Sequence, residues 1–233
     1  MIRTFPTLDI WAEAAADRLA TALADALAAD GRALFAGSGG STPSPIYARL
    51  AQADLDWASV TTTLVDERYV PESSPDSNAA LLKRTLLTGP ADAALFIPLY
   101  SPAVTVDRAA ALASQALAAE GRSLDAVLLG MGEDGHICSM FPGSPTLTTL
   151  LTPGLKPAVY GVPAGRDGAA PPQERLTLNL PWLAGARCVV LALTGAKKRA
   201  VFEREATGDP AVSPIAALIT ANAPLEVFWT EAD

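Results

Sequence analysis

The chain contains one histidine, His136, in the glycine-rich segment 130–143 that directly follows the apolar run 124–129. Histidine titrates nearest to neutral pH and is the side chain that most often moves protons in enzymes. Asp134 stands two positions earlier, where its carboxylate can hold the imidazole or accept a hydrogen bond from a substrate hydroxyl. The sequence leaves both roles for Asp134 open. It predicts that any proton transfer by an imidazole uses His136.

The same segment also matches a pattern that is typical of dinucleotide binding. Residues 130–135 read Gly-Met-Gly-Glu-Asp-Gly after a predicted strand, as in the G-x-G-x-x-G fingerprint. Glu133 and Asp134 would then face a pyrophosphate and repel it, and the acidic residue that should end the next strand is missing. We therefore expect no dinucleotide at this segment.

A second glycine-rich turn, residues 37–43, follows the apolar run 33–36. Glycines allow backbone N–H groups to approach a ligand closely, and Pro43 suits the first turn of a helix. A helix start with two hydroxyl side chains just before the proline favours phosphate, although no Gly-Lys-Ser/Thr follows and the turn is not a P-loop. An ordinary strand-to-helix turn is the alternative. The residues predicted to bind phosphate are Gly39, Gly40, Ser41 and Thr42.

Charged residues gather after a third apolar run, 60–65. The sequence Asp-Glu-Arg-Tyr at 66–69 suits a substrate with several hydroxyls and one anionic group, and a solvated strand end is the alternative. Because the net charge of the chain is −8, cations that bind an anionic substrate must gather locally. We expect Arg68 to bind substrate.

Apolar periodicity predicts the elements that carry these residues. A helix is expected over 7–29 with Thr7 as its cap. Further helices are expected over 43–53, 78–87, 107–120 and 195–206, and strands over 33–36, 60–65, 95–99, 124–129, 158–162, 175–178, 188–193 and 225–229. Short apolar strands that alternate with helices predict a Rossmann-like α/β fold, with a mostly parallel twisted sheet and helices on both faces.

The predicted sheet places the chemistry at one edge. In open parallel sheets ligands bind beyond the carboxyl ends of the strands. Because Asp66 and Asp134 both follow short predicted strands, we expect them to share a pocket with Arg68 and His136.

Composition limits the function classes. The chain has 233 residues, half of them apolar, and is expected to fold as one domain over residues 1–233. The acidic balance argues against nucleic acid and membrane surfaces as partners. The sequence shows no signal peptide and no long apolar run, and its two cysteines form no disulfide framework. These features predict a soluble cytoplasmic protein. We expect it to be a monomer or a small homo-oligomer.

Several reaction chemistries find no support in the sequence. One histidine and no paired cysteines make a zinc site improbable, and there is no G-x-S-x-G motif of a serine hydrolase. Nothing in the sequence requires magnesium, although carboxylates able to bind it are present. We expect no metal and no cofactor.

Five segments together resemble the 6-phosphogluconolactonase branch of the sugar-phosphate isomerase and deaminase-like superfamily. They are Gly39-Gly-Ser-Thr-Pro43, Asp66-Glu-Arg-Tyr-Val-Pro71 with Ser77-Asn78, 130–143, Pro171-Pro-Gln-Glu-Arg-Leu-Thr177 and Gly195-Ala-Lys197. The resemblance runs from about residue 33 to 206. One departure is an insertion at Gly165–Ala170, where the family often has a lysine beside the double proline.

The resemblance implies hydrolysis of 6-phospho-D-glucono-1,5-lactone to 6-phosphogluconate in the oxidative pentose phosphate pathway, without a cofactor. It implies catalysis by His136 with Asp134 and Asp66, on a small sugar phosphate. It also indicates Arg175 and Lys197 as substrate-binding cations, for each of which a solvated surface charge is the alternative. A glucosamine-6-phosphate deaminase/isomerase is one alternative, but the segment 138–143 carries no acid where that relative has one. A non-enzymatic sugar-phosphate sensor is the other, and the retained histidine counts against it.

Overall fold

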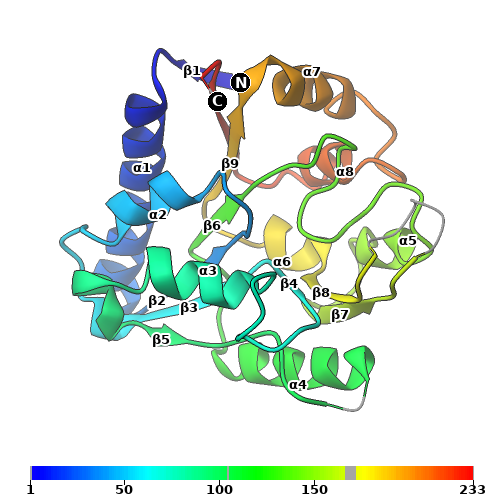
Figure 1. The fold of residues 1–233 in the computed structure, drawn as a ribbon, viewed down its shortest axis with the longest axis horizontal. Helices are drawn as coiled ribbons and strands as arrows, with labels where there is room; N and C mark the ends of the chain where they lie inside the picture. The colour runs from blue at the N-terminus through cyan, green and yellow to red at the C-terminus, as the bar shows by residue number, and fades with distance from the viewer. Residues whose placement is uncertain (1, 104, 166–171, 233) are drawn as a thin grey trace.

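The computed structural model describes residues 2–103, 105–165 and 172–232. Within these ranges seven strands form one sheet, and all its pairings are parallel (Figure 1). In spatial order the strands are β1 (Ile2–Phe5), β10 (Leu225–Thr230), β9 (Val189–Thr194), β6 (Ala126–Leu129), β2 (Ala33–Gly37), β3 (Val60–Leu64) and β5 (Leu95–Phe96). The predicted mostly parallel α/β sheet is confirmed.

Helices lie on both faces of this sheet and beside it. In the described ranges they are α1 (Leu8–Asp30), α2 (Ser44–Leu50), α3 (Asn78–Thr85), α4 (Val106–Ala119), α5 (Leu147–Leu150), α6 (Leu180–Ala184), α7 (Gly195–Glu205) and α8 (Pro214–Thr220), with 3-10 turns η1 (Trp57–Ser59) and η2 (Gly89–Ala93). In Figure 1, α1 and α2 lie on one side of the strands, and α6, α7 and α8 lie on the other. None of the helices in the described ranges has both the length and the hydrophobicity to cross a membrane.

Helix α1 shows how local sequence sets an element. The Thr7 side chain accepts a hydrogen bond from Ile10 N at 3.2 Å, as expected of a helix cap. Gly31 ends the helix with φ 69°, a left-handed conformation that glycine adopts without strain. The Trp11 side chain is fully buried against the sheet, and its Nε1 donates to Phe228 O at 3.0 Å.

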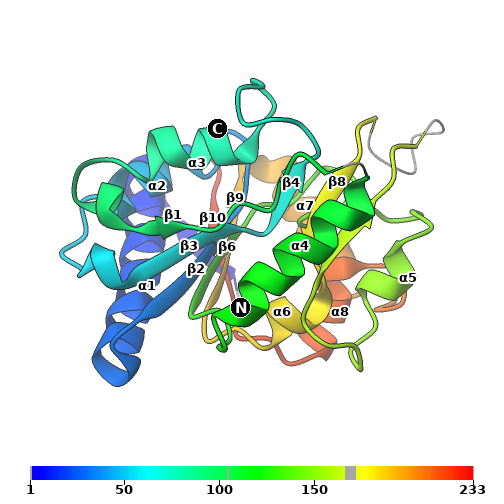
Figure 2. The ribbon, with the colours of Figure 1, turned by 90° about the horizontal axis from the view of Figure 1, so that it is seen from below.

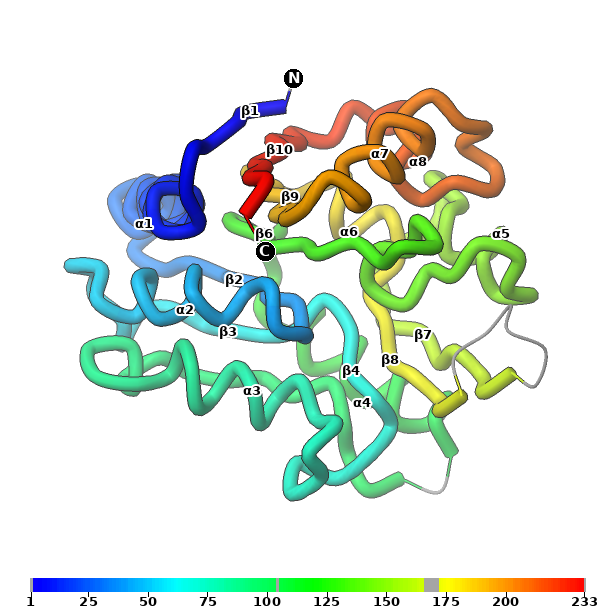
Figure 3. Tube along the Cα trace, turned by 45° about the horizontal axis from the view of Figure 1, so that its top comes forward, coloured from blue at the N-terminus to red at the C-terminus, as the bar shows by residue number. Residues whose placement is uncertain are grey.

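A smaller antiparallel sheet stands beside the large one. Its strands, in order, are β4 (Asp66–Arg68), β8 (Arg175–Leu178) and β7 (Val159–Val162). Helix α4 packs against β7 and β8, and Figures 2 and 3 both show this group at one side of the molecule. Val65 connects the two sheets, because its N–H donates to Gly37 O and its carbonyl accepts from Leu178 N, both at 2.9 Å.

Some predicted elements differ from the structure. Residues 66–68, predicted as the loop that ends a strand, form β4, because they pair with β8 more than a hundred positions away. The predicted strand at 95–99 is only two residues long, and strand β1 and helix α8 were not predicted. The predicted insertion at Gly165–Ala170 lies outside the described residues from 166 onward.

Candidate active site

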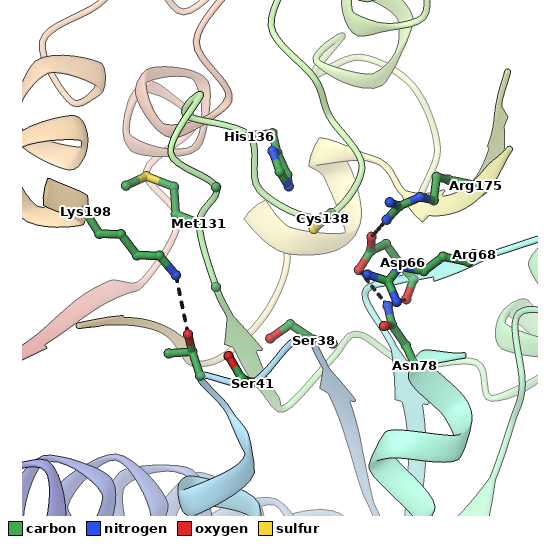
Figure 4. A pocket seen from close by; sticks show the side chains of 15 residues that line it. Ser38, Ser41, Asp66, Arg68, Asn78, Met131, His136, Cys138, Arg175 and Lys198 are labelled. Carbon is green, nitrogen blue, oxygen red and sulfur yellow. Dashed lines mark hydrogen bonds and ion pairs between the residues drawn. The ribbon is translucent and has the colours of Figure 1, made fainter. Parts of the chain in front are cut away.

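A cavity of about 240 Å³ opens at the carboxyl edge of the large sheet (Figure 4). Strands β2 and β6 deliver the segments 38–42 and 130–132 to it, β4 and β8 of the small sheet supply further residues, and α7 closes one side. It is lined by Ser38, Gly39, Gly40, Ser41, Thr42, Asp66, Arg68, Asn78, Gly130, Met131, Gly132, His136, Cys138, Arg175 and Lys198. Three of these side chains are cationic and one is anionic, so the cavity is locally positive within a chain of net charge −8.

His136 lies in the long loop after β6, and its ring extends toward the cavity (Figure 4). Its Nδ1 lies 2.5 Å from Asp134 Oδ1, and its backbone N–H donates to the same oxygen at 3.2 Å. This hydrogen bond lowers the pKa of Asp134. Because Nδ1 is engaged by the carboxylate, Nε2 is the nitrogen left to exchange a proton with a ligand.

The surroundings of the imidazole hold it in place. The ring packs against Phe141 with centroids 4.4 Å apart. A Cβ at Gly132 would overlap the ring, which explains why a glycine stands there.

Asp66, Arg68 and His136 share the cavity as expected, but Asp134 does not line it, so the prediction was wrong for this residue. Asp134 contacts the imidazole at Nδ1 instead.

The structure of the histidine loop also tests its match to the dinucleotide-binding fingerprint. A dinucleotide fingerprint needs a helix that begins at its glycines. Residues 130–146 contain no helix, and the next one, α5, begins only at Leu147. The match to G-x-G-x-x-G is therefore a sequence coincidence.

Asp66 lines the cavity and is almost fully buried. Its Oδ2 accepts a hydrogen bond from Ser139 Oγ at 2.6 Å and lies 3.7 Å from Arg175 Nη1, and its Oδ1 lies 3.4 Å from Asn78 Nδ2. The carboxylate therefore joins the histidine loop to the small sheet. Ser139 and Asn78 were not predicted as site residues. Both stand within motifs that the sequence already singled out.

Arg68 and Arg175 are direct neighbours across the small sheet. Both line the cavity, and each has a buried Nε that makes no hydrogen bond within the described ranges. Burial lowers the pKa of Arg175, and the nearby Asp66 carboxylate opposes that effect. Buried donors without a partner are costly, so a ligand that accepts from them is favoured.

The structure corrects the prediction for Lys197, which does not line the cavity. Lys197 is exposed and pairs with Glu133. Its neighbour Lys198 lines the cavity, and its Nζ lies 3.4 Å from Thr42 Oγ1. Consecutive residues on a helix point about 100° apart, so only one of the two lysines faces the cavity.

The glycine turn after β2 lines the cavity from Gly39 to Thr42, and phosphate binding by this turn stays a prediction. A Cβ at Gly39 would overlap the Asn78 side chain, and Gly40 adopts φ 89°. Ser38, just before the turn, was not predicted. Its Oγ is buried at the cavity and has no hydrogen-bond partner among the described residues.

Metal binding finds no support in the geometry of the described residues. No group of three or more His, Cys, Asp or Glu side chains within the described ranges is arranged to hold an ion. The cations and unpaired donors of the cavity suit an anionic ligand with hydroxyl groups.

The model of one protein family, described as glucosamine-6-phosphate isomerases/6-phosphogluconolactonase, matches residues 6–229 of the chain. The chain belongs to this family. A 6-phosphogluconolactonase of Rhizobium meliloti is 44% identical to it over 220 residues, which cover 94% of this chain and 93% of the relative. One of Mesorhizobium japonicum is 41% identical over 225 residues, covering 97% and 93%.

The solved structures agree with the sequence relatives. The crystal structure of a 6-phosphogluconolactonase from Shewanella baltica superimposes with a TM-score of 0.89 at 32% identity, and covers 99% of this chain and 97% of that one. Both its fold and its sequence are thus similar to those of the present chain.

Proposed function

We propose that the chain is a 6-phosphogluconolactonase, which hydrolyses 6-phospho-D-glucono-1,5-lactone to 6-phosphogluconate in the oxidative pentose phosphate pathway. The observation that carries the proposal is the imidazole of His136, oriented by Asp134 at the wall of a locally positive cavity. Relatives that cover nearly the whole chain and carry that name support it.

In the proposed reaction, Nε2 of His136 removes a proton from a water molecule while the oxygen of that water attacks the carbonyl carbon of the lactone. The bond between the carbonyl carbon and the ring oxygen then breaks, and the imidazolium returns the proton to that oxygen, which becomes a hydroxyl. Asp134 stabilises the imidazolium through Nδ1. General acid–base assistance of this kind contributes about 10²–10⁴-fold. The reaction uses neither a metal nor a cofactor.

The substrate's phosphate needs cations and donors, and the cavity supplies both. We assign Lys198, Arg175 and the turn from Gly39 to Thr42 to substrate binding, with Lys198 in place of Lys197. Arg68 serves as a further substrate contact. We assign Asp66, held by Ser139, to the hydroxyl-bearing side of the sugar and not to proton transfer, because no hydrogen bond joins it to His136 in the described structure.

Deamination of glucosamine 6-phosphate is the alternative within the same family. The loop that follows His136 runs over 137–143 without an acid. Among the described residues, Asp134 is the carboxylate that contacts the imidazole and Asp66 the one that lines the cavity. That arrangement favours the lactonase. A sensor without activity would have no use for the oriented imidazole.

Hydrolysis of freshly generated 6-phosphogluconolactone, followed beside ammonia release from glucosamine 6-phosphate, tests the proposal. We expect lactone hydrolysis only. His136→Asn should lower kcat by about 10²–10⁴-fold and leave the affinity for 6-phosphogluconate near that of the wild type. Ammonia release, or near-normal turnover in the variant, would refute the assignment.

The remaining expectations stay proposals. A cytoplasmic location agrees with two buried cysteines, Cys138 and Cys188, that form no disulfide. A single domain agrees with the one hydrophobic cluster formed by buried residues from both ends of the described chain. For the assembly we propose a monomer or small homo-oligomer.

A further inference from the structure

The acid between Asp66 and Arg68 faces away from the cavity. Side chains alternate along a strand, so Glu67 of β4 points to the side opposite its two neighbours, toward the start of α3. Glu67 is fully buried and forms no ion pair with a described residue. A buried carboxylate without a cation is costly unless hydrogen bonds satisfy it.

Four hydrogen bonds satisfy this carboxylate. Oε1 accepts from the backbone N–H groups of Arg68 and Asn78, each at 2.7 Å. Oε2 accepts from Ala79 N at 2.8 Å and from Ser77 Oγ at 3.1 Å. The first N–H groups of a helix have no partner within it and favour negative charge, so α3 compensates for the missing cation. Burial nevertheless raises the pKa of Glu67.

Two of these four donors belong to residues that line the cavity. Arg68 presents its guanidinium there, and Asn78 donates through Nδ2 to Asp66 O at 2.9 Å. Asn78 also packs so closely on Gly39 that a Cβ at that glycine would overlap it. A shift of α3 relative to β4 would therefore change the position of the asparagine and the glycine turn relative to the arginine.

We propose that Glu67 is a positioning residue for substrate binding, which fixes the backbone of Arg68 and Asn78 and thereby sets one wall of the cavity. The proposal rests on the lactonase activity proposed above. Glu67 touches neither the imidazole nor the cavity. Its removal should weaken the binding of substrate and product more than it slows the chemical step.

Two substitutions of Glu67 test separately the need for its charge and the need for its length. Glu67→Gln keeps the shape but replaces one acceptor oxygen by an NH₂ group, so the two donors bound to that oxygen lose their acceptor. Glu67→Asp keeps the charge but is one methylene shorter, so it cannot hold both Arg68 N and the start of α3. For either variant we expect the KM for the lactone and the Kd for 6-phosphogluconate, measured by calorimetry, to rise about tenfold. The value of kcat should stay within about threefold.

A matched control is Thr7→Ala, which removes the cap of α1 without touching the cavity. It should lower the melting temperature and leave KM unchanged. Glu67→Gln should add little to the KM of Arg68→Gln or of Asn78→Ala, because all three changes weaken the same wall.

The outcomes are distinguishable. A wild-type chain that does not hydrolyse the lactone refutes the proposed function, whatever the variants do. With an active wild type, a lowered melting temperature at unchanged KM and Kd makes Glu67 a helix cap only and overturns the inference. Full additivity with both Arg68→Gln and Asn78→Ala overturns it as well. If Glu67→Gln does not fold, Glu67→Asp decides by the same criteria.

Discussion

Two adjacent lysines offer a direct test of the proposed phosphate site. Lys198 faces the cavity beside Thr42, and Lys197 faces Glu133 at the surface. A charge-assisted hydrogen bond contributes about 1.5–3 kcal/mol, so Lys198→Ala should raise the KM for the phosphorylated lactone about tenfold or more. Lys197→Ala should change it less than about twofold, because exposed ion pairs contribute little.

The same pair should be measured on unphosphorylated gluconolactone. There Lys198→Ala should have little effect, since the group it binds is missing. Equal losses on both lactones would show that Lys198 does not recognise the phosphate.

The contact between Asp134 and His136 predicts a pH effect with a definite sign. The pKa of Asp134 is lowered by its hydrogen bond to the imidazole, so the carboxylate is ionised at neutral pH. Its contribution to stability is present above about pH 4 and is lost as the pH falls through the lowered value. In Asp134→Asn the imidazolium loses its anionic partner and gives up its proton more readily. The acid limb of the pH–rate profile should therefore move to lower pH.

The profile also distinguishes the two roles that the sequence left open. An unchanged acid limb with a raised KM would make Asp134 a contact for a sugar hydroxyl. The geometry favours orientation, because Asp134 lies behind the imidazole and not at the cavity.

The histidine loop is the element on which the proposed reaction depends most. Its Gly132 has no room for a Cβ, which would overlap the His136 ring. Gly132→Ala should displace the imidazole and lower kcat about tenfold or more, with the Kd for 6-phosphogluconate nearly unchanged. Gly154→Ala is the control, since a Cβ there meets nothing within 4 Å. A fully active Gly132→Ala would show that the ring tolerates movement.

The elements also show what local sequence can and cannot predict. Apolar runs predicted β2, β3, β6 and β9 because nearly all their residues are buried, on both faces of the sheet. Nothing local predicts that Asp66–Arg68 pairs with Arg175–Leu178, since the two segments are distant along the chain and the pairing is a tertiary choice. The choice between Lys197 and Lys198 needed the helix phase, which a one-residue error in the start of α7 reverses.

The residues that line the candidate site were more predictable than the residues that hold them in position. His136, Arg68 and the turn at Gly39 stand where strands end, and a parallel sheet brings strand ends together. Ser139 reaches Asp66 only where the histidine loop meets the small sheet, and Glu67 reaches Asn78 only because β4 lies against the start of α3. The sequence motifs that contain these residues could be recognised, but the residues to which they hydrogen-bond could not be predicted.

In the whole molecule, the residues that line the cavity and a buried ion pair that stabilises the fold lie at opposite edges of the large sheet. The cavity lies at the carboxyl edge, whereas Asp125 precedes β6 at the amino edge. Its Oδ2 accepts from Leu34 N at 2.7 Å and pairs with Arg122 at 2.7 Å, and its side chain is 1% exposed. This carboxylate ties β6 to β2 far from the proposed chemistry.

Asp125→Ala should therefore destabilise the fold without altering catalysis. It leaves Leu34 N without an acceptor and deprives Arg122 of a buried partner, for a loss of about 3 kcal/mol in the free energy of unfolding. In a chain of this length that lowers the melting temperature by about 6–12 °C. Asp125→Asn retains an acceptor for Leu34 N and should lose less. Below the melting transition both variants should keep kcat and KM within about twofold. A changed KM in a well-folded Asp125→Ala would instead mean that the two edges are energetically coupled through β2 and β6.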